Sequence, residues 1–551
     1  MIRSTAPAPY ADRVTRTGSG GAAKPPVSGW LDGRMLARYG LPGFAGSLML
    51  TIGAFGVGWL PLKTGVVEIA YVEALRGTTL GTLMSRALIF VGVALLLQAW
   101  LILGHDLLAS RDDPHALTDA TPANMTAILV TWCAPLLIAP PLFSRDVYSY
   151  FTQGRVLDMG ADPYTTGVSV VDGWFQDGVD PMWAETPTPY GPFFLLISRG
   201  VANFAADQPA LAALVFRVIA LIGVAMLVVY VPRLAFLHGI NPARALWLGV
   251  LNPLVVMHFV AGAHNDALMA GFVVMGLCLA AERHAAWGAA AIALGASVKP
   301  IALLALPCVG LEWAGLRSNW WQRVRGWLLA GVVAGAVFLA TALLAGVGFG
   351  WINALSAPGE VRTWLSPPTA IGMIVGGGTT WLGLTIDNNM AVAIARIIGA
   401  IAGAAIVLWL ILKPEGRSPV RGCALAFVAV IVLGPAFQPW YLLWFLPLFA
   451  VTGLTAVQLR WVILLIAGFS LHGMAESSAT SDNLFEFSDG LAILAAFAVV
   501  GLVLLVSPRE RRLVLGGPLS HGLLPVDAPA QARAEQSVFR GRIGPQEGET
   551  A

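Results

Sequence analysis

The sequence has little charge. Only 12% of its 551 residues are charged, whereas 57% are hydrophobic. One water-soluble core cannot bury that much apolar surface, so the composition predicts a polytopic membrane protein. The 33 Lys and Arg nearly balance the 31 Asp and Glu, which gives no indication of a nucleic-acid partner. P-loop, GxGxxG, HExxH and GxSxG motifs are all missing, so nucleotide chemistry has no support.

Cysteine is also scarce. The four cysteines, Cys133, Cys278, Cys308 and Cys423, stand alone within apolar runs. Without a CxxC pair or a Cys/His cluster, neither a disulfide scaffold nor a zinc site is expected. No dense group of carboxylates suggests a hard-cation site either. We therefore expect no metal and no cofactor.

Apolar runs dominate the rest of the chain. Those long enough to cross a hydrocarbon layer of about 30 Å occur near residues 42–61, 86–104, 123–143, 210–231, 327–347, 390–412 and 488–507. Shorter runs occupy 244–260, 265–282, 285–298, 300–316, 421–437, 440–455 and 460–475. Together they predict an all-α bundle of about 14 transmembrane helices.

The basic residues indicate how this bundle is oriented. Threading the spans from a cytoplasmic N-terminus places the Lys- and Arg-containing short loops on one side, which the positive-inside rule makes the cytoplasm. The two long connections, 144–209 and 348–389, then face the periplasm. Residues 1–40 and 511–551 are expected to be disordered cytoplasmic tails around a membrane domain at 41–510. We expect a multi-pass protein of the plasma (inner) membrane.

The first long outer segment carries the best candidate for a catalytic group. Asp146 follows Arg145 at the end of the third apolar run. Partial desolvation would raise the pKa of such a carboxyl and suit it to act as a base, whereas Arg145 would lower that pKa. A helix-ending Arg/Asp pair is the alternative interpretation. Tyr148 and Tyr150 suggest an interfacial helix here, and residues 193–206 suggest a second one.

Further polar residues occur at the outer ends of later spans. They are Arg217, His264, Asn265, Asp266, Lys299, Arg396, Gln438, Trp440 and Tyr441. Each arginine could simply snorkel to the interface. Several cations converging on one leaflet instead suggest a phosphate-bearing lipid headgroup.

Six motifs in these segments carry a resemblance to a known family. They are Ser-Arg-Asp-Val-Tyr-Ser-Tyr at 144–150, Asp-Pro-Tyr at 162–164, Tyr-Gly-Pro at 190–192, Ala-His-Asn-Asp at 263–266, Lys-Pro at 299–300 and Gln-Pro-Trp-Tyr at 438–441. The chain resembles, over roughly 40–510, the polyprenol-phosphate-mannose-dependent α-1,6-mannosyltransferases of the actinobacterial cell envelope. These are integral-membrane glycosyltransferases of the GT-C class.

The resemblance implies an activity and roles for the residues. An inverting transfer would move mannose from polyprenyl-phosphate-mannose, among membrane lipids, to a lipid-linked mannan acceptor in lipomannan and lipoarabinomannan synthesis. Asp146 would be the catalytic base, and Lys299, Arg145, Arg217 and Arg396 would bind the donor phosphate. The remaining substrate contacts would come from Tyr148, Tyr150, Tyr190, His264, Asn265, Asp266, Gln438, Trp440 and Tyr441.

Two alternatives remain open at this point. A GT-C enzyme could transfer another prenyl-linked sugar such as arabinofuranose, because sugar identity rests on the resemblance alone. A transporter or lipid flippase also uses broken helices with polar turns. The polar turns here gather at one face of the membrane and the halves show no repeat, which favours an enzyme.

Overall fold

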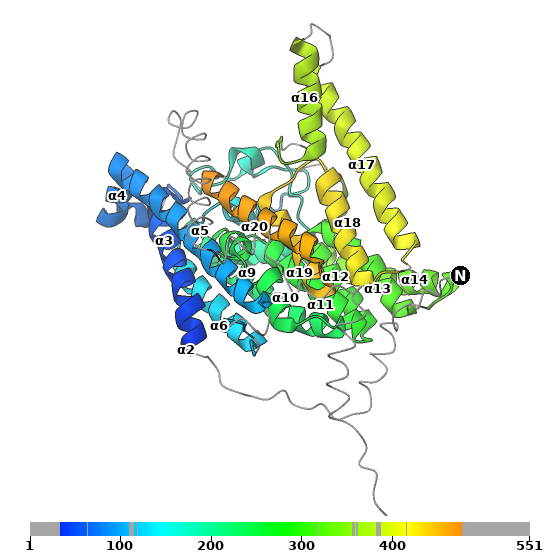
Figure 1. Ribbon diagram of the computed structural model, residues 1–551. Helices are drawn as coiled ribbons and strands as arrows, with labels where there is room; N and C mark the ends of the chain where they lie inside the picture. The colour runs from blue at the N-terminus through cyan, green and yellow to red at the C-terminus, as the bar shows by residue number, and fades with distance from the viewer. Residues whose placement is uncertain are drawn as a thin grey trace, which may run out of the picture.

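The architecture is helical throughout the part of the chain that the structure describes (Figure 1). The computed structural model describes residues 33–62, 64–109, 115–117, 119–315, 317–354, 359, 362–381, 387–414, 416–476 and 508. No strand occurs within these ranges. The predicted all-α class is therefore confirmed for them.

Long apolar helices form the frame of the molecule. Six of the described helices are long and apolar enough to cross a membrane, which makes the chain a multi-pass membrane protein. They are a first helix built from α2 (Gly33–Met35), η1 (Leu36–Gly40) and α3 (Leu41–Val57), then α5 (Thr79–Leu108), α9 (Pro209–Leu237), α14 (Trp320–Ala345), α17 (Asn388–Leu412) and α20 (Ala456–Glu476). The expected tail at 1–40 is thus helical from Gly33 onward, because Met35 and Tyr39 are buried.

Shorter apolar helices fill the centre. They are α6 (Pro122–Cys133) with η3 (Ala134–Ile138), α10 (Pro242–Gly249), η6 (Val255–Ala261), α11 (Asp266–Ala281), α12 (Ala285–Val298), η7 (Pro300–Ala305), α13 (Leu306–Ala314), α18 (Pro419–Leu433), η9 (Pro439–Tyr441) and α19 (Leu442–Thr452). α6 with η3 lies in the predicted long run at 123–143, and the others lie in the shorter predicted runs. The count of about 14 spans stays a prediction, and the run at 488–507 lies outside the described residues.

One of these central elements is sharply bent. The axes of η6 and α11 meet at 113° across the turn at 262–265, as in a broken span or a re-entrant loop. Backbone polar groups that such a break exposes must be satisfied inside the protein. Arg217 of α9 does so, because its guanidinium donates to the carbonyls of Leu137, Val260 and Ala261.

The connections between spans contain helices of their own. The segment after η3 holds α7 (Asp146–Asp158), η4 (Val168–Val170), η5 (Pro181–Trp183) and α8 (Pro192–Ala205), and other connections hold η2 (Gly65–Glu68), α4 (Ala70–Gly77), α15 (Trp351–Ala354) and α16 (Pro367–Trp381). Every residue of α7 from 147 to 154 is buried within the protein, and the interfacial placement of this helix stays a prediction. The outer segment 348–389 is more structured than predicted, and α16 projects with the end of α17 beyond the other helices (Figure 1).

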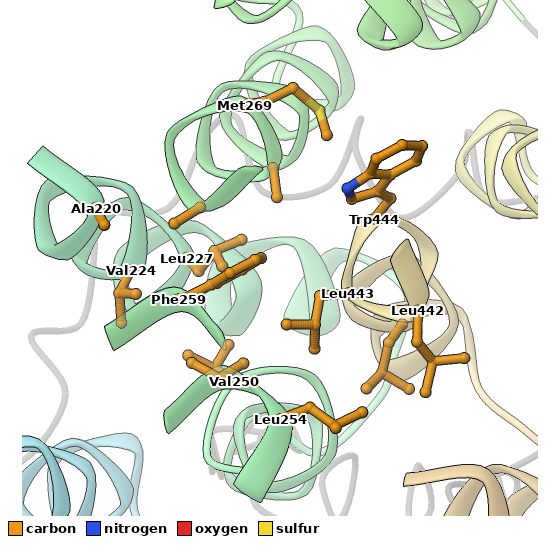
Figure 2. Close-up of a cluster of buried hydrophobic side chains, with 14 of the residues drawn as sticks. Ala220, Val224, Leu227, Val250, Leu254, Phe259, Met269, Leu442, Leu443 and Trp444 are labelled. Atoms are coloured by element: carbon orange, nitrogen blue, oxygen red, sulfur yellow. The ribbon is translucent and has the colours of Figure 1, made fainter. Parts of the chain in front are cut away.

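Aromatic and aliphatic side chains pack the interior. Trp100 of α5 and Trp247 of α10 stack at 5.1 Å, and each indole N–H donates to the other residue's backbone carbonyl. Figure 2 shows part of the buried cluster, in which α19 brings Leu442, Leu443 and Trp444 to face Val250, Leu254, Phe259 and Met269. This close packing gives the polar turns described next a rigid support.

A buried carboxylate ties the end of α5 to the first helix. Asp106 has no exposed side-chain surface and accepts hydrogen bonds from Arg38 and Tyr39, both at 2.8 Å. His105 Nδ1 lies 3.0 Å from the other carboxylate oxygen. Both oxygens of Asp106 are therefore occupied by protein groups.

Candidate functional site

Asp146 begins α7 directly after a strained stretch of backbone. Phe143 has a positive φ of 65°, which a non-glycine residue adopts only at a cost of about 1–3 kcal/mol. The backbone N–H of Asp146 then donates to the Ser144 hydroxyl at 3.1 Å. The chain thus places the Asp146 carboxyl at the first turn of α7 with 20% of its side chain exposed.

The turn at 262–265 shows the same kind of strain. Ala263 has a φ of 51°, and the next three residues are His264, Asn265 and Asp266. All three are essentially buried, with exposures of 0%, 2% and 0%. Polar side chains that are buried and held by strained backbone are typical of functional sites.

Asp266 forms the centre of a polar cluster. Its Oδ1 accepts from Lys299 Nζ at 2.7 Å and from the indole N–H of Trp444 at 2.7 Å. Lys299 ends α12, and its Nζ lies 5.0–5.9 Å from the ring centres of Tyr190, Tyr441 and Trp444. The ammonium is therefore fixed by a carboxylate and an aromatic cage.

Gly191 brings the outer segment against this cluster. A Cβ on Gly191 would lie only 2.5 Å from the backbone of Ser297, so a larger residue has no room there. The Gly191 N–H donates to the Val298 carbonyl at 3.0 Å. This close approach sets Tyr190 beside Lys299.

Asp146 meets the same cluster through His264. His264 Nδ1 lies 3.7 Å from Asp146 Oδ2 and 3.9 Å from Asp266 Oδ2. Burial raises the pKa of Asp146 to about 6, while Lys299 lowers it and the charges of Asp266 and Asp180 raise it. A carboxyl with such a pKa is ionised at neutral pH yet basic enough to take a proton.

Several polar atoms here have no partner among the described residues. They are both ring nitrogens of His264, Oδ2 of Asp266 and Nδ2 of Asn265. Buried polar groups in folded proteins are almost always hydrogen-bonded, so unpaired ones that cluster indicate a place for a polar ligand or water. A sugar carries hydroxyls that both donate and accept.

The tyrosines predicted to contact substrate divide into two groups. Tyr190 and Tyr441 surround Lys299, and Tyr150 reaches Asn265 through a long hydrogen bond of 3.5 Å. Tyr148 instead donates to the Trp59 carbonyl at 2.8 Å, which anchors α7 to the segment after α3.

The Gln438–Tyr441 break contributes mainly through its aromatic residues. The indole of Trp440 stacks on the ring of His264 with centroids 4.2 Å apart. Gln438 accepts the Tyr441 N–H through its backbone, and its side chain is half-buried.

The predicted arginines are not all at the site. Arg145 lies beside it, stacked 4.5 Å from Trp59 and paired with Asp180 at 3.1 Å. The guanidinium of Arg217 donates to the three carbonyls named above. That of Arg396 donates to the Thr369 hydroxyl and the Gly359 carbonyl. These contacts are structural and do not support the predicted role of Arg217 and Arg396 in binding phosphate.

Sequence reasoning missed four residues at this site. Trp444 lies one helical turn after Tyr441, and that spacing could have suggested it. Trp183 ends the three-residue helix η5 and Asp180 precedes it, and so short an element has no periodicity to detect. His258 is a buried histidine whose ring lies 5.5 Å from Trp440 and 6.1 Å from His264, and a polar residue inside an apolar run is itself a signal.

Metal ligands do not gather in the part of the chain that is described. No group of three or more His, Cys, Asp or Glu side chains there could hold a metal ion. The four cysteines are buried and unpaired. The absence of a metal requirement stays a prediction.

An apolar groove lies between α8, α9 and α11. It has a volume of about 440 Å³ and is lined by Phe193, Ile197, Phe204, Ile219, Leu268 and Phe272. Along the chain, Leu268 follows Asp266 by two residues and Phe193 follows Tyr190 by three.

The helical membrane fold with a basic carboxylate and a caged cation at one polar site defines a polytopic membrane enzyme. Comparison with known proteins gives the family. Residues 40–315 match the model described as alpha-(1->6)-mannopyranosyltransferase, N-terminal domain, and residues 368–506 match an MptB C-terminal domain. The chain belongs to this alpha-(1->6)-mannopyranosyltransferase family, so it is a glycosyltransferase of the mannosyltransferase type, as the resemblance predicted.

Relatives in three actinobacteria support this assignment. A probable alpha-(1->6)-mannopyranosyltransferase of Mycolicibacterium smegmatis is 33% identical over 90% of this chain and 92% of its own. Alpha-(1->6)-mannopyranosyltransferase A of Mycobacterium tuberculosis is 34% identical over 78% and 82%, respectively. The enzyme of that name from Corynebacterium glutamicum is 32% identical over 77% and 89%.

Proposed function

We propose that this protein transfers mannose from polyprenyl-phosphate-mannose to a lipid-anchored mannan, forming α-1,6 linkages on the outer face of the plasma membrane in lipomannan and lipoarabinomannan synthesis. The observation that carries the proposal is the joint placement of Asp146, His264 and the Lys299–Asp266 pair at one site. The relatives' names supply the sugar and the linkage.

Asp146 supplies the base in a single displacement. The acceptor 6-hydroxyl attacks C1 of the donor mannose, its proton passes to Asp146, and the C1–O bond to phosphate breaks. One in-line displacement inverts a β-linked donor to an α-linked product. The raised pKa of Asp146 fits this task, because a base works best when its pKa lies near the operating pH.

Lys299 stabilises the leaving phosphate. An ammonium has three N–H donors, and Asp266 accepts one of them at 2.7 Å. The other two can bind phosphate oxygens while the pair stays intact. Trp444 holds Asp266 in place through the same carboxylate oxygen, so the cation is oriented before the donor arrives.

The apolar groove between α8, α9 and α11 supports a lipid-linked donor. Its lining is almost entirely hydrophobic, which suits an isoprenoid chain. A nucleotide sugar has no comparable use for an apolar groove, and nucleotide sugars are confined to the cytoplasm.

A transfer assay tests the proposal. Purified enzyme in vesicles receives radiolabelled prenyl-phosphate-mannose and a short α-1,6-mannoside, and the linkage of the product is analysed. We expect one added α-1,6-mannose, and no transfer from GDP-mannose. Transfer only from prenyl-phosphate-arabinofuranose would overturn the sugar assignment.

Sidedness is tested by cysteine labelling. The four native cysteines are buried, so single cysteines at exposed positions report alone. Val170→Cys in the outer segment should react with an impermeant maleimide in intact cells, and Arg317→Cys only after permeabilisation. The reverse pattern would invert the topology and remove the need for a lipid-linked donor.

A further inference from the structure

His264 occupies a position that packing alone does not explain. Its ring has no exposed surface and stacks on Trp440 at 4.2 Å with an interplanar angle of 27°. The stack fixes the ring plane, and the strained Ala263 fixes the backbone. A phenylalanine would stack equally well, yet the chain buries an imidazole whose two nitrogens lack partners among the described residues.

The ring nitrogen Nδ1 faces two carboxylates at once. Asp146 Oδ2 lies 3.7 Å away and Asp266 Oδ2 lies 3.9 Å away. Both distances exceed a hydrogen bond, but closing the first requires a movement of less than about 1 Å. Catalytic hydrogen bonds are often long in the free enzyme and tighten in the complex.

The surroundings determine which form of the imidazole is present. A lone pair at Nδ1 would face two anionic oxygens and be repelled, whereas an N–H would be attracted. Burial, together with the nearby Lys299, lowers the pKa of His264 to about 3. The ring is therefore a neutral N–H donor across the working pH range.

We infer that His264 is a positioning residue that donates its Nδ1–H to Asp146 and thereby keeps this base ionised beside the Asp266 charge. The inference rests on the proposed function, because it takes Asp146 to be the base. Hydrogen bonds to the charged form of an acid favour that form. Such a bond would lower the pKa of Asp146, against the burial and the Asp266 charge that raise it.

Other titratable groups surround this pair and are common to every variant below. Those that face Asp146 are Asp180, Asp266, Lys299 and the hydroxyls of Tyr150, Tyr190 and Tyr441, and His258 lies behind His264. Because they stay unchanged, a shift in the pH profile of a His264 variant reports the missing N–H.

The test compares pH profiles of kcat/KM for three enzymes in vesicles. His264→Phe keeps the ring stack and removes the donor. We expect its acidic limb to move upward by about one to two pH units, the effect of one hydrogen bond to a charged group, with activity returning toward wild type at about pH 9. In His264→Asn the amide nitrogen is three bonds from Cα, as Nδ1 is in histidine, so an N–H donor is restored. The acidic limb of this variant should return toward that of the wild type.

Three results would overturn the inference. If the acidic limb of the pH profile is unchanged in His264→Phe, His264 contributes packing and no hydrogen bond to Asp146. If the limb moves to lower pH, Nδ1 accepts a hydrogen bond and does not donate one. The inference is also contradicted if the acidic limb of His264→Asn lies at the same pH as that of His264→Phe. If His264→Phe fails to fold, His264→Met replaces it, because methionine also lacks a donor.

The failure of this inference is distinguishable from failure of the proposed function. If wild type transfers no mannose, or if Asp146→Asn remains active, the proposed function is wrong. If wild type transfers mannose, Asp146→Asn is inactive and the His264 limb does not move, only the role of His264 is wrong.

Discussion

The protein contains two buried acidic centres that are built in opposite ways. At the end of α5, both oxygens of Asp106 are occupied by Arg38, Tyr39 and His105. At the other centre, His264 Nδ1 lies 3.7 Å from Asp146, and Asp266 keeps one oxygen without a partner among the described residues. The first centre has no capacity left for a ligand, while the second is incomplete without one.

This is the difference expected between a structural carboxylate and a functional one. Hydrogen bonds to an ionised group stabilise the fold, whereas an unpaired buried polar group costs about 1–3 kcal/mol. Unpaired buried polar groups persist at binding sites, where a substrate supplies the missing hydrogen bonds. We therefore expect the two centres to respond oppositely to the same substitution.

Asp146→Asn should show the largest effect on activity. The amide keeps the shape but cannot accept the proton, so the transfer rate should fall by about 10²–10⁴-fold. Radiolabel transfer at saturating donor and acceptor measures this loss. Turnover near that of wild type would make Asp146 a structural helix terminus.

The same variant should not lose stability. The pKa of Asp146 is raised from 3.8 to about 6, so its contribution to stability is present below pH 3.8 and is lost as the pH rises through 6. At pH 8 the ionised group destabilises the fold. We expect the melting temperature of Asp146→Asn at pH 8 to equal or exceed that of the wild type. A clearly lower melting temperature would mean that Asp146, like Asp106, stabilises the fold.

Asp106→Asn is the matched substitution at the other centre. It removes the charge that binds Arg38 and Tyr39, and it should lower the free energy of unfolding by about 2–3 kcal/mol, since Arg38 is 39% exposed and partly screened. A melting curve in detergent measures this. The folded enzyme should keep near wild-type kcat/KM, and a large kinetic loss without destabilisation would break the comparison.

Lys299→Gln should reduce donor turnover by roughly ten- to a hundred-fold, because it removes a charge-assisted contact to phosphate. It also leaves Asp266 without its cation. The double variant Asp266→Asn/Lys299→Gln separates these effects. If the double variant regains wild-type kinetics, Lys299 only neutralises Asp266 and does not bind the donor.

The wild-type pH profile should show a smaller effect. Asp146 acts as a base only when ionised, so kcat/KM should fall about tenfold per pH unit below roughly pH 6, consistent with a pKa of about 6. Rates between about pH 4.5 and 8.5 test this. A flat profile through that range would mean that Asp146 does not limit the reaction.

Arg396→Gln should show the smallest effect. Its guanidinium donates to Thr369 and Gly359, so we expect the donor KM to change by less than about threefold. The variant is a cation-removing control for Lys299→Gln. A loss as large as that of Lys299→Gln would restore Arg396 as a phosphate ligand.

The sequence predicts the helices well because their signal is local. Long apolar runs and the polar breaks at His264, Lys299 and Gln438 mark where helices begin and end, and the structure places elements at each described run. Helix α16 was missed because it carries Gly376, Gly377 and Gly378, which weaken a helical pattern.

The site is only partly visible in the sequence because its contacts are distant along the chain. Trp444 binds Asp266 across 178 residues, and no local pattern reports such a pair. Arg217 was assigned to phosphate from its depth alone, which cannot reveal the three carbonyls it meets. Asp146, by contrast, is a candidate from the sequence alone, because a carboxylate beside an apolar run is costly in itself.

The Trp444–Asp266 hydrogen bond joins residues that are made at different times during translation. Translation at roughly 5–20 residues per second produces Lys299, 33 residues after Asp266, within about 2–7 s. Trp444, 178 residues after Asp266, follows only about 9–36 s after that aspartate, at the same elongation rate. Lys299, the cation that pairs with Asp266, is therefore made well before Trp444, so the final geometry of this carboxylate waits for α19.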